Sequence, residues 1–419
     1  MNTAHPALLL SDRIAELLSD PERTPTGWSS RPQWRQSLAH GAPGIALLHI
    51  ERAAAGRGPW EPVRAWLSVA ADGPLTSGAD SYLYYGAPAL ALVLDCAAQA
   101  HPGSYQRAMD RLDRVVAADT VRRCERAEAR LERGDLPKLA EFDTIRGLAG
   151  LGAVLLRRAP GGTAVRRVLG CLVRLTDEVK HDGELLPGWW TLDGPSGERD
   201  ERFPDGHANN GLAHGIAGPL ALMALGLRRG VEVDGQREAI RRILAWLERW
   251  RDDHAWPYWT TPAHLSGPDR RPYPPQRPSW CYGTAGIARA QQLAALALGD
   301  QRVRHDAESA LATALVDPKA LAATTDLSAC HGYAGLAHIA HRAAADATAP
   351  GAARLRSAAA LLLDTTHPPH ADPGEQAHRL LATVGPAFLE GAAGTALALL
   401  APATGSTPAT RWDTCFLTA

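Results

Sequence analysis

The chain has 419 residues, of which 45% are hydrophobic, and a formal net charge of -1. This composition supports a substantial buried core, and the near-zero charge gives no basic field that would attract nucleic acid or an anionic membrane. No uncharged apolar run is long enough to cross a bilayer, so we expect no membrane span.

The N-terminal segment MNTAHPALLLSDRIAELLSD has no basic region before its apolar residues. It therefore predicts an amphipathic helix rather than a signal peptide. The cysteines are scattered, without the spacing of a disulfide framework; they are Cys96, Cys124, Cys171, Cys281, Cys330 and Cys415. We expect a reduced, cytoplasmic protein.

A Gly-x-x-Gly turn recurs seven times, and each copy precedes a run rich in Ala and Leu with few charges. The copies begin at Gly41, Gly86, Gly147, Gly215, Gly283, Gly332 and Gly391, and the second ends in Ala89 instead of glycine. Such runs predict helices buried on most of their surface. The stretches between them, such as GQREAIRRILAWLERWRDD, have one polar face and predict exposed helices.

Almost nothing in the chain alternates with a period of two, so we predict an all-α protein. The repeat favours a double-layered α/α toroid, or barrel, of about seven inner and seven outer helices, formed by residues 1–419 as a single domain. Ranges 102–141 and 151–210 have room for a small excursion, although neither shows a clear strand-rich insertion. The alternative is that each turn serves only the close packing of two helices.

Two long loops, residues 187–210 and 256–279, directly precede the turns at Gly215 and Gly283. Both are rich in Pro, Gly and aromatic residues. They could form the walls of a cleft or be plain surface loops. Tyr273, in the second loop, is one of the aromatic residues that could line such a cleft.

If the seven turns are equivalent, their residues gather at one end of the ring. The residue before each first glycine then lies near the axis; these residues are His40, Tyr85, Arg146, His214, Tyr282, His331 and Glu390. One position earlier stand Cys281 and Cys330. Cys281, Cys330 and His331 would offer two thiolates and one imidazole to a single Zn²⁺, leaving the fourth tetrahedral position open, as in catalytic zinc sites. A lone Cys-His pair is usually structural, and it is the shared register that favours zinc.

Three further residues are candidates for chemistry. His214 has the same place in its turn as His331, and its imidazole suits a general acid or base; otherwise it only holds a loop. Asp143 stands four residues before Gly147 and could orient His214 or cap a turn. Arg277, four residues before Cys281, could stabilise a developing oxyanion or be a surface arginine.

Together these motifs resemble the lanthionine synthetase C-like family, the lanthipeptide cyclases, in its free-standing class I type. The resemblance covers nearly the whole chain and rests on FDTIRGLAG (142–150), NGLAHGIAG (210–218), RPSWCYG (277–283) and CHGYAG (330–335). It implies an α toroid with one zinc ion held by Cys281, Cys330 and His331. It also implies that Asp143, His214, Arg277 and Tyr282 occupy the remaining active-site positions.

The resemblance further implies the reaction. Peptide cysteine thiolates add to dehydroalanine or dehydrobutyrine, forming lanthionine or methyllanthionine thioether rings in a dehydrated ribosomal precursor peptide with leader and core. A dehydratase and an exporter would be the partners, and through them the protein would be held at the membrane. The alternatives are addition of glutathione to dehydroamino acids and a non-catalytic zinc-containing scaffold that binds peptide. A zinc-dependent prenyltransferase is disfavoured because no acidic ligand stands in register with the cysteines.

Overall fold

The computed structural model describes residues 5–27, 31–195, 197–266, 276–368 and 370–419. The chain forms two compact units. The first comprises Met1–Val115 and Thr324–Asp413, and the second comprises Val116–Ala323 and Thr414–Ala419. Each unit is described by itself below. Tyr273, which the sequence placed in a candidate cleft wall, lies outside the described residues.

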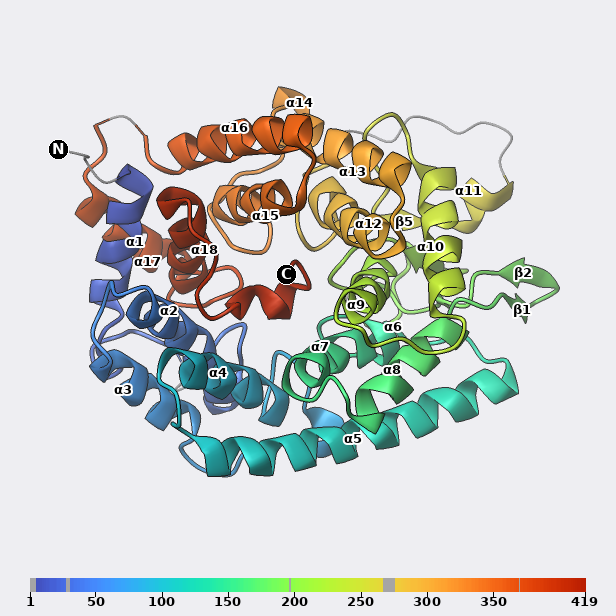
Figure 1. The fold of residues 1–419 in the computed structure, drawn as a ribbon, viewed down its shortest axis with the longest axis horizontal. Helices are drawn as coiled ribbons and strands as arrows, with labels where there is room; N and C mark the ends of the chain where they lie inside the picture. Colours follow the sequence, from blue (N-terminus) through green and yellow to red (C-terminus); the bar gives the residue numbers. More distant parts are fainter. Residues whose placement is uncertain (1–4, 28–30, 196, 267–275, 369) are drawn as a thin grey trace. The chain divides into compact units, whose positions relative to one another are not determined.

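The repeated turns lead into seven buried helices, as the sequence predicts (Figure 1). Six of them have the first glycine of the turn as their N-cap, and α9 begins two residues after Gly215. In the first unit these helices are α2 (Ala42–Ala54), α4 (Ala87–Ala100), α15 (Tyr333–Asp346) and α18 (Ala392–Thr404). In the second they are α7 (Leu148–Arg158), α9 (Ala217–Arg228) and α12 (Thr284–Leu298).

The helices between the turns are mostly amphipathic and pack with one face on the buried set. α10, for example, buries Ile240, Ile243 and Leu247 while its charged residues face outward. In the first unit they are α1 (Pro6–Leu17), α3 (Glu61–Ala70), α16 (Ala349–Thr366) and α17 (Pro373–Val384). In the second they are α6 (Leu139–Phe142), α8 (Thr163–Arg174), α10 (Gln236–Trp250), α11 (Pro262–Ser266), α13 (Gln301–Ala314) and α14 (Pro318–Leu321).

Packing follows the chain order within each unit. In the first unit α15 contacts α16 and α18, and α2 contacts α3 and α4. In the second α12 contacts α9 and α13 (Figure 1). The long helix α5 (Gln106–Arg133) contains the boundary between the two units, and short 3-10 helices occupy Pro32–Gln36, Gly78–Asp80 and Trp412–Phe416. In the described part of the chain, no helix combines the length and apolar character that a bilayer crossing requires.

The structure has short strands that the sequence pattern does not indicate, four of them within range 151–210 and one, β5, after it. β1 (Val179–His181) and β2 (Glu184–Leu186) form a hairpin. β3 (Trp190–Thr191), β4 (His207–Asn209) and β5 (Trp259–Thr260) form a small antiparallel sheet. None exceeds three residues, which is too short to produce a readable alternation. The other range, 102–141, is occupied mainly by α5.

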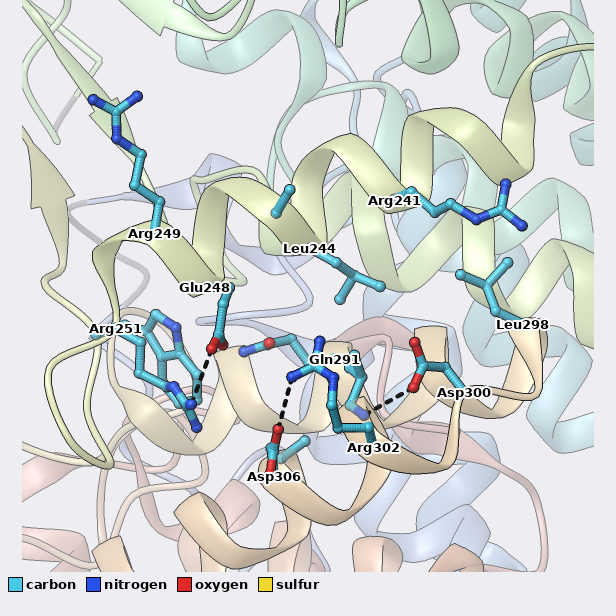
Figure 2. A pocket seen from close by; sticks show the side chains of 14 residues that line it. Arg241, Leu244, Glu248, Arg249, Arg251, Gln291, Leu298, Asp300, Arg302 and Asp306 are labelled. Atoms are coloured by element: carbon cyan, nitrogen blue, oxygen red, sulfur yellow. Dashed lines mark hydrogen bonds and ion pairs between the residues drawn. The ribbon is translucent and has the colours of Figure 1, made fainter.

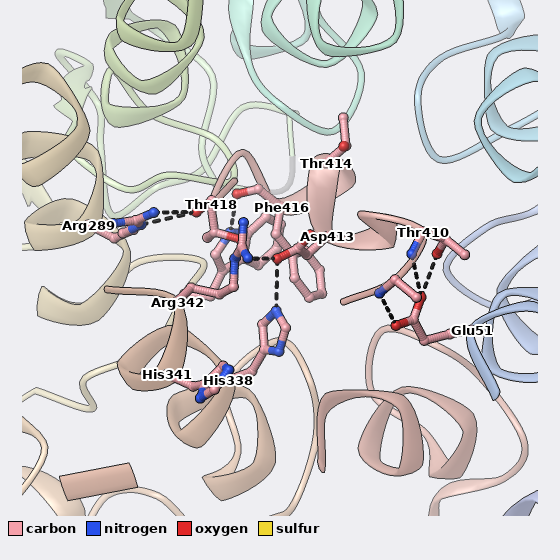
Figure 3. Close-up of polar contacts among 12 residues, drawn as sticks. Glu51, Arg289, His338, His341, Arg342, Thr410, Asp413, Thr414, Phe416 and Thr418 are labelled. Atoms are coloured by element: carbon pink, nitrogen blue, oxygen red, sulfur yellow. Dashed lines mark hydrogen bonds and ion pairs between the residues drawn. The ribbon is translucent and has the colours of Figure 1, made fainter. Parts of the chain in front are cut away.

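The last residues of the chain are buried among charged side chains of the inner helices (Figure 3). In the first unit the Glu51 carboxylate accepts hydrogen bonds from the backbone N–H groups of Ala409 and Thr410, at 2.6 and 2.9 Å, and from the Thr410 hydroxyl at 2.6 Å. Asp413 lies 3.1 Å from Nε2 of His338. The buried carboxylates of Glu51 and Asp413 therefore both have polar partners, without which their desolvation would be costly.

In the second unit the guanidinium of Arg289, which is fully buried, donates to the carbonyl oxygen of Thr418 at 2.8 and 3.0 Å (Figure 3). The indole of Trp280 donates to the carbonyl of Phe416 at 2.9 Å. Polar residues in the otherwise apolar inner helices α12 and α2 therefore have a structural explanation: they bind the main chain of the C-terminal segment.

Buried histidine makes the first unit sensitive to acid. His49 on α2 is 5% exposed, its Nε2 donates to the carbonyl of Leu18 at 2.9 Å, and burial lowers its pKa to about 4. It is therefore neutral in the folded protein, whereas in the unfolded chain it takes up a proton near pH 6.5. The protein therefore has the full stability that neutral His49 allows above about pH 6.5. As the pH falls toward 4, protonation of the unfolded chain lowers the free energy of unfolding by about 3 kcal/mol.

We therefore expect His49→Gln to reduce the fall in Tm between pH 7 and pH 5, although the variant begins from a lower Tm because a buried hydrogen bond is disturbed. Thermal unfolding followed by circular dichroism at a series of pH values measures this. His254→Gln, at a half-buried site in the second unit, is the control and should keep the wild-type pH profile. An unchanged profile in His49→Gln would show that His49 does not carry the acid sensitivity.

Candidate metal centre and acid–base pair

A hydroxyl or carboxylate four residues before the first glycine fixes the shape of several turns. In three copies a serine Oγ accepts the N–H of the residue just before that glycine: Ser37 from His40 at 3.1 Å, Ser279 from Tyr282 at 3.4 Å and Ser328 from His331 at 3.2 Å. In a fourth, Oδ1 of Asp143 accepts from the N–H groups of Arg146 and Gly147, at 2.6 and 2.8 Å. These local bonds satisfy donors at the helix start and give equivalent turns the same conformation.

Glycine is required in the two cysteine-containing turns because the chain folds back on itself. A Cβ on Gly283 would lie 2.1 Å from the backbone nitrogen of Ser279, and a Cβ on Gly332 would lie 2.1 Å from that of Ser328. Any other residue would therefore clash with the main chain. The glycines thus hold the residues that precede them, Cys281-Tyr282 and Cys330-His331, in tight loops at the starts of α12 and α15.

In the first unit, main-chain hydrogen bonds join the equivalent turns to one another. The N–H of Cys330 donates to the carbonyl of Leu389 at 3.1 Å, and the N–H of Leu389 donates to Ala39 at 3.1 Å. The N–H of Leu38 donates to Tyr84 at 2.9 Å. Within this unit the sixth, seventh, first and second turns are therefore adjacent, with equivalent positions bonded between the sixth, seventh and first.

The second unit repeats the arrangement. The N–H of Thr144 donates to the carbonyl of Ala213 at 3.0 Å, and the N–H of Ala213 donates to that of Cys281 at 3.1 Å. The third, fourth and fifth turns are thus adjacent. The expectation that equivalent turns gather together holds within each unit, and it brings Asp143, His214 and Tyr282 into one neighbourhood.

The donor set of Cys281, Cys330 and His331 fits zinc. Cys281 at the start of α12 and the pair Cys330-His331 at the start of α15 offer the donor atoms that a metal ion could bind. Both cysteines are buried, and the Sγ of Cys281 lies 3.4 Å from the hydroxyl of Ser279. No disulfide involves either of them among the described residues. Two sulfurs and an imidazole suit zinc and disfavour the hard cations magnesium and calcium, which prefer oxygen.

Asp326, which the sequence analysis did not single out, contacts the proposed ligand His331. Its Oδ2 lies 3.3 Å from Nε2 of His331, and its Oδ1 accepts the N–H of Ser328 at 2.8 Å. Burial alone would raise the pKa of this carboxyl, but the hydrogen bonds from His331 and Ser328 hold the pKa well below its usual range. A carboxylate on Nε2 fixes the tautomer of a ligand histidine and assigns Nδ1 to a metal.

His214 and Asp143 form an imidazole–carboxylate pair. Nδ1 of His214 lies 2.7 Å from Oδ2 of Asp143, which is 1% exposed, while the side chain of His214 retains 26% exposure. The two oxygens of Asp143 therefore do both things that the sequence left open: Oδ1 holds its own turn, and Oδ2 orients His214. Nε2 of His214 is left as the atom that can exchange a proton with a substrate.

Aromatic rings surround this pair in the second unit. The ring of Tyr282 stacks on His214 with centroids 5.9 Å apart, and it also contacts Tyr258 at 5.8 Å and Trp259 at 6.0 Å. The Tyr258 hydroxyl donates to the carbonyl of Arg277 at 3.0 Å. Burial raises the pKa of the Tyr258 phenol, and the charge of Arg277 opposes that shift. Tyr282 thus touches His214 directly, and Arg277 is joined to the cluster through Tyr258.

A separate cleft of approximately 700 Å³ lies between α10 and α13 of the second unit (Figure 2). Its charged side chains are largely paired with one another, Arg251 with Glu248 at 3.0 Å and Arg302 with Asp306 at 3.1 Å. None of the predicted site residues lines it. This cleft is large, but it is not the candidate reaction site, because the candidate reactive side chains lie elsewhere.

Comparison with known proteins agrees with this fold and these motifs. A family model described as lanthionine synthetase C-like protein matches residues 32–417. Nisin biosynthesis protein NisC from Lactococcus lactis subsp. lactis is 24% identical over 205 residues, which are 48% of this chain and 48% of that protein. The chain therefore matches about half the length of this curated relative.

The structure of nisin cyclase is similar over 97% of this chain and 96% of that one, with a TM-score of 0.75 and 21% sequence identity. This likeness confirms the predicted fold class, an all-α toroid. Because the family model extends over most of the residues, the protein belongs to the lanthionine synthetase C-like family.

Proposed function

We propose that the protein is a zinc-dependent lanthipeptide cyclase. Its substrate is a ribosomal precursor peptide, leader plus core, in which serine and threonine have been dehydrated. The protein joins cysteine thiols of that peptide to dehydroalanine or dehydrobutyrine, forming thioether rings. The observation that carries the proposal is the combination, in a member of this family, of a Cys-Cys-His donor set with a separate His214–Asp143 pair.

Cys281, Cys330 and His331 would hold the zinc ion, with Asp326 supporting His331. The ion would supply a Lewis acid that lowers the pKa of the substrate thiol and so provides a thiolate near neutral pH. Three protein ligands would leave room for that thiol, and the two cysteine thiolates would keep the site electron-rich. The similar solved structure is that of a cyclase, which supports ring closure as the class of reaction.

The protein's own side chains would manage the protons. In the addition a carbon–sulfur bond forms at Cβ, the double bond becomes an enolate, and a proton is added at Cα. The proton lost by the thiol balances the proton gained at Cα. His214 is placed to exchange protons through Nε2, since Asp143 engages Nδ1 and favours the imidazolium when it forms. Arg277 or His214 would stabilise the enolate oxygen, and Tyr282 would hold the ring of His214.

Mass spectrometry tests the proposal directly. Purified protein loaded with zinc is mixed with a dehydrated peptide that contains one cysteine and one dehydroalanine, in the presence and absence of glutathione. Ring closure leaves the peptide mass unchanged and protects the thiol from alkylation, and we expect this result with or without glutathione. A mass increase equal to one glutathione would support addition of the small thiol instead.

If the peptide binds but stays open and alkylatable, the protein is a scaffold and the cyclase proposal is wrong. A metal measurement accompanies this test, because a structural zinc would have its fourth position closed by a protein group. A dehydratase and an exporter remain the partners we propose. Co-purification with each of them tests that part.

A further inference from the structure

A cleft of approximately 380 Å³ in the first unit lies beside the ligand His331. Its lining includes Leu380 and Val384 of α17 and residues 325–328 of the loop before the sixth turn. Glu390, the residue before the seventh turn, also lines it. The sequence singled out this position as one of seven near the axis, and the proposed mechanism gives it no role.

The cleft is continuous with the surroundings of His331. Asp326, which lines the cleft, lies 3.3 Å from Nε2 of the imidazole, and Glu390, which also lines it, lies 4.0 Å from Nδ1. The two carboxylates therefore flank the same ring on both of its nitrogens. A peptide whose thiol reacts beside His331 has its neighbouring residue within reach of this cleft, since consecutive Cα atoms are about 3.8 Å apart.

The lining identifies the kind of side chain that fits. α17 buries only Ala377 in the protein, and its Val384 is 37% exposed. Leu380 and Val384 are four residues apart and so lie on one face of the helix, which faces the cleft. Gln376 is already bound within the protein, to His367 at 2.8 Å and to the carbonyl of Thr366 at 2.7 Å. Besides the polar Arg379 and Thr383, the lining offers the apolar side chains of Leu327, Leu380 and Val384, and its volume has room for a large aliphatic or aromatic side chain.

We propose that this cleft is a specificity subsite that binds an apolar side chain next to the reacting cysteine of the substrate peptide. The inference rests on the proposed cyclase function and names the substrate feature that the same site selects. Glu390 lines the subsite on the side of His331, and Leu380 and Val384 contribute its apolar surface.

The test compares two peptides that differ only beside the cysteine, one with leucine and one with serine. In the wild-type holoprotein kcat/KM should be higher for the leucine peptide. In Val384→Asp we expect kcat/KM for that peptide to fall about tenfold, mainly through KM, because a charge replaces apolar surface. The serine peptide should be unaffected. Leu361→Asp, on α16 at 58% exposure and away from the cleft, is the control and should change neither value.

Equilibrium binding gives the subsite a readout that does not depend on turnover. Both peptides are prepared with alanine in place of dehydroalanine, and their Kd values are measured by fluorescence anisotropy, together with the zinc content of each variant. Val384→Asp should weaken only the leucine peptide, with zinc content unchanged. Equal affinity of both peptides for the wild type, or equal loss for both in Val384→Asp, overturns the subsite. If the alanine peptides show this selectivity but the matching dehydroalanine peptides are not closed into rings, the proposed function is contradicted and the subsite remains supported.

Discussion

Cys330→Ala is expected to lose bound zinc and ring closure together. The change removes one of the two proposed thiolate ligands, and the remaining cysteine and histidine are too few protein ligands to hold zinc tightly. Metal content measured by mass spectrometry should fall at least about tenfold after dialysis against a weak chelator. Ring closure, followed by thiol alkylation, should become undetectable. Cys281→Ala should behave in the same way.

Cys96→Ala is the matched control for this experiment. Cys96 is also fully buried, but its Sγ lies 3.7 Å from the carbonyl of Thr410 and it takes no part in the donor set. This variant should keep one zinc per chain and normal turnover, even if its Tm is lower. A Cys330→Ala protein that retained stoichiometric zinc and full activity would show that the ligand assignment is wrong.

His214→Asn should give the opposite combination, with retained metal and lost ring closure. The variant removes the imidazole that is bound to Asp143 through Nδ1, and with it the proposed proton exchange at Nε2. A missing general acid or base lowers the rate by about 10²- to 10⁴-fold. Zinc content and single-turnover ring closure, measured on the same preparation, separate binding of the metal from the chemistry.

Two further variants sharpen that experiment. Asp143→Asn keeps an oxygen for the turn but removes the charge beside His214, so its rate should also fall while its zinc remains. His181→Asn, on the hairpin of β1 and β2, should match the wild type. Normal turnover in His214→Asn would remove its proposed role, and loss of zinc from that variant would point to a role in holding the metal centre.

Much of the fold is readable from the sequence because the repeat is a local signal. Each Gly-x-x-Gly turn and the apolar run after it predict one buried helix, and the structure has a helix at all seven positions. The register of the turns also predicts which residues are equivalent, and the main-chain bonds from Cys330 to Leu389 and from Ala213 to Cys281 agree with that register.

Other features depend on contacts that a single sequence does not encode in its spacing. Asp143 could be read as a cap or as a partner of His214, and only the structure shows that its two oxygens do both. Asp326 stands six residues before Gly332, outside the positions that the repeat makes equivalent, so no pattern connected it to His331. In the sequence, Leu380 and Val384 of α17 have the spacing of residues that face a core. Only the structure shows that they line a cleft instead.

Main-chain hydrogen bonds, such as those from Cys330 to Leu389 and from Ala213 to Cys281, join neighbouring turns. Side chains at the positions just before each first glycine can therefore differ freely without breaking the connection, and in this protein they are as unlike as Tyr85, Arg146 and Glu390. In such a scaffold the side chains before the glycines can change the chemistry without changing the main-chain bonds that hold the turns together. It should tolerate the installation of new functional groups, turn by turn, and is for that reason a promising starting point for the directed evolution of altered catalysts.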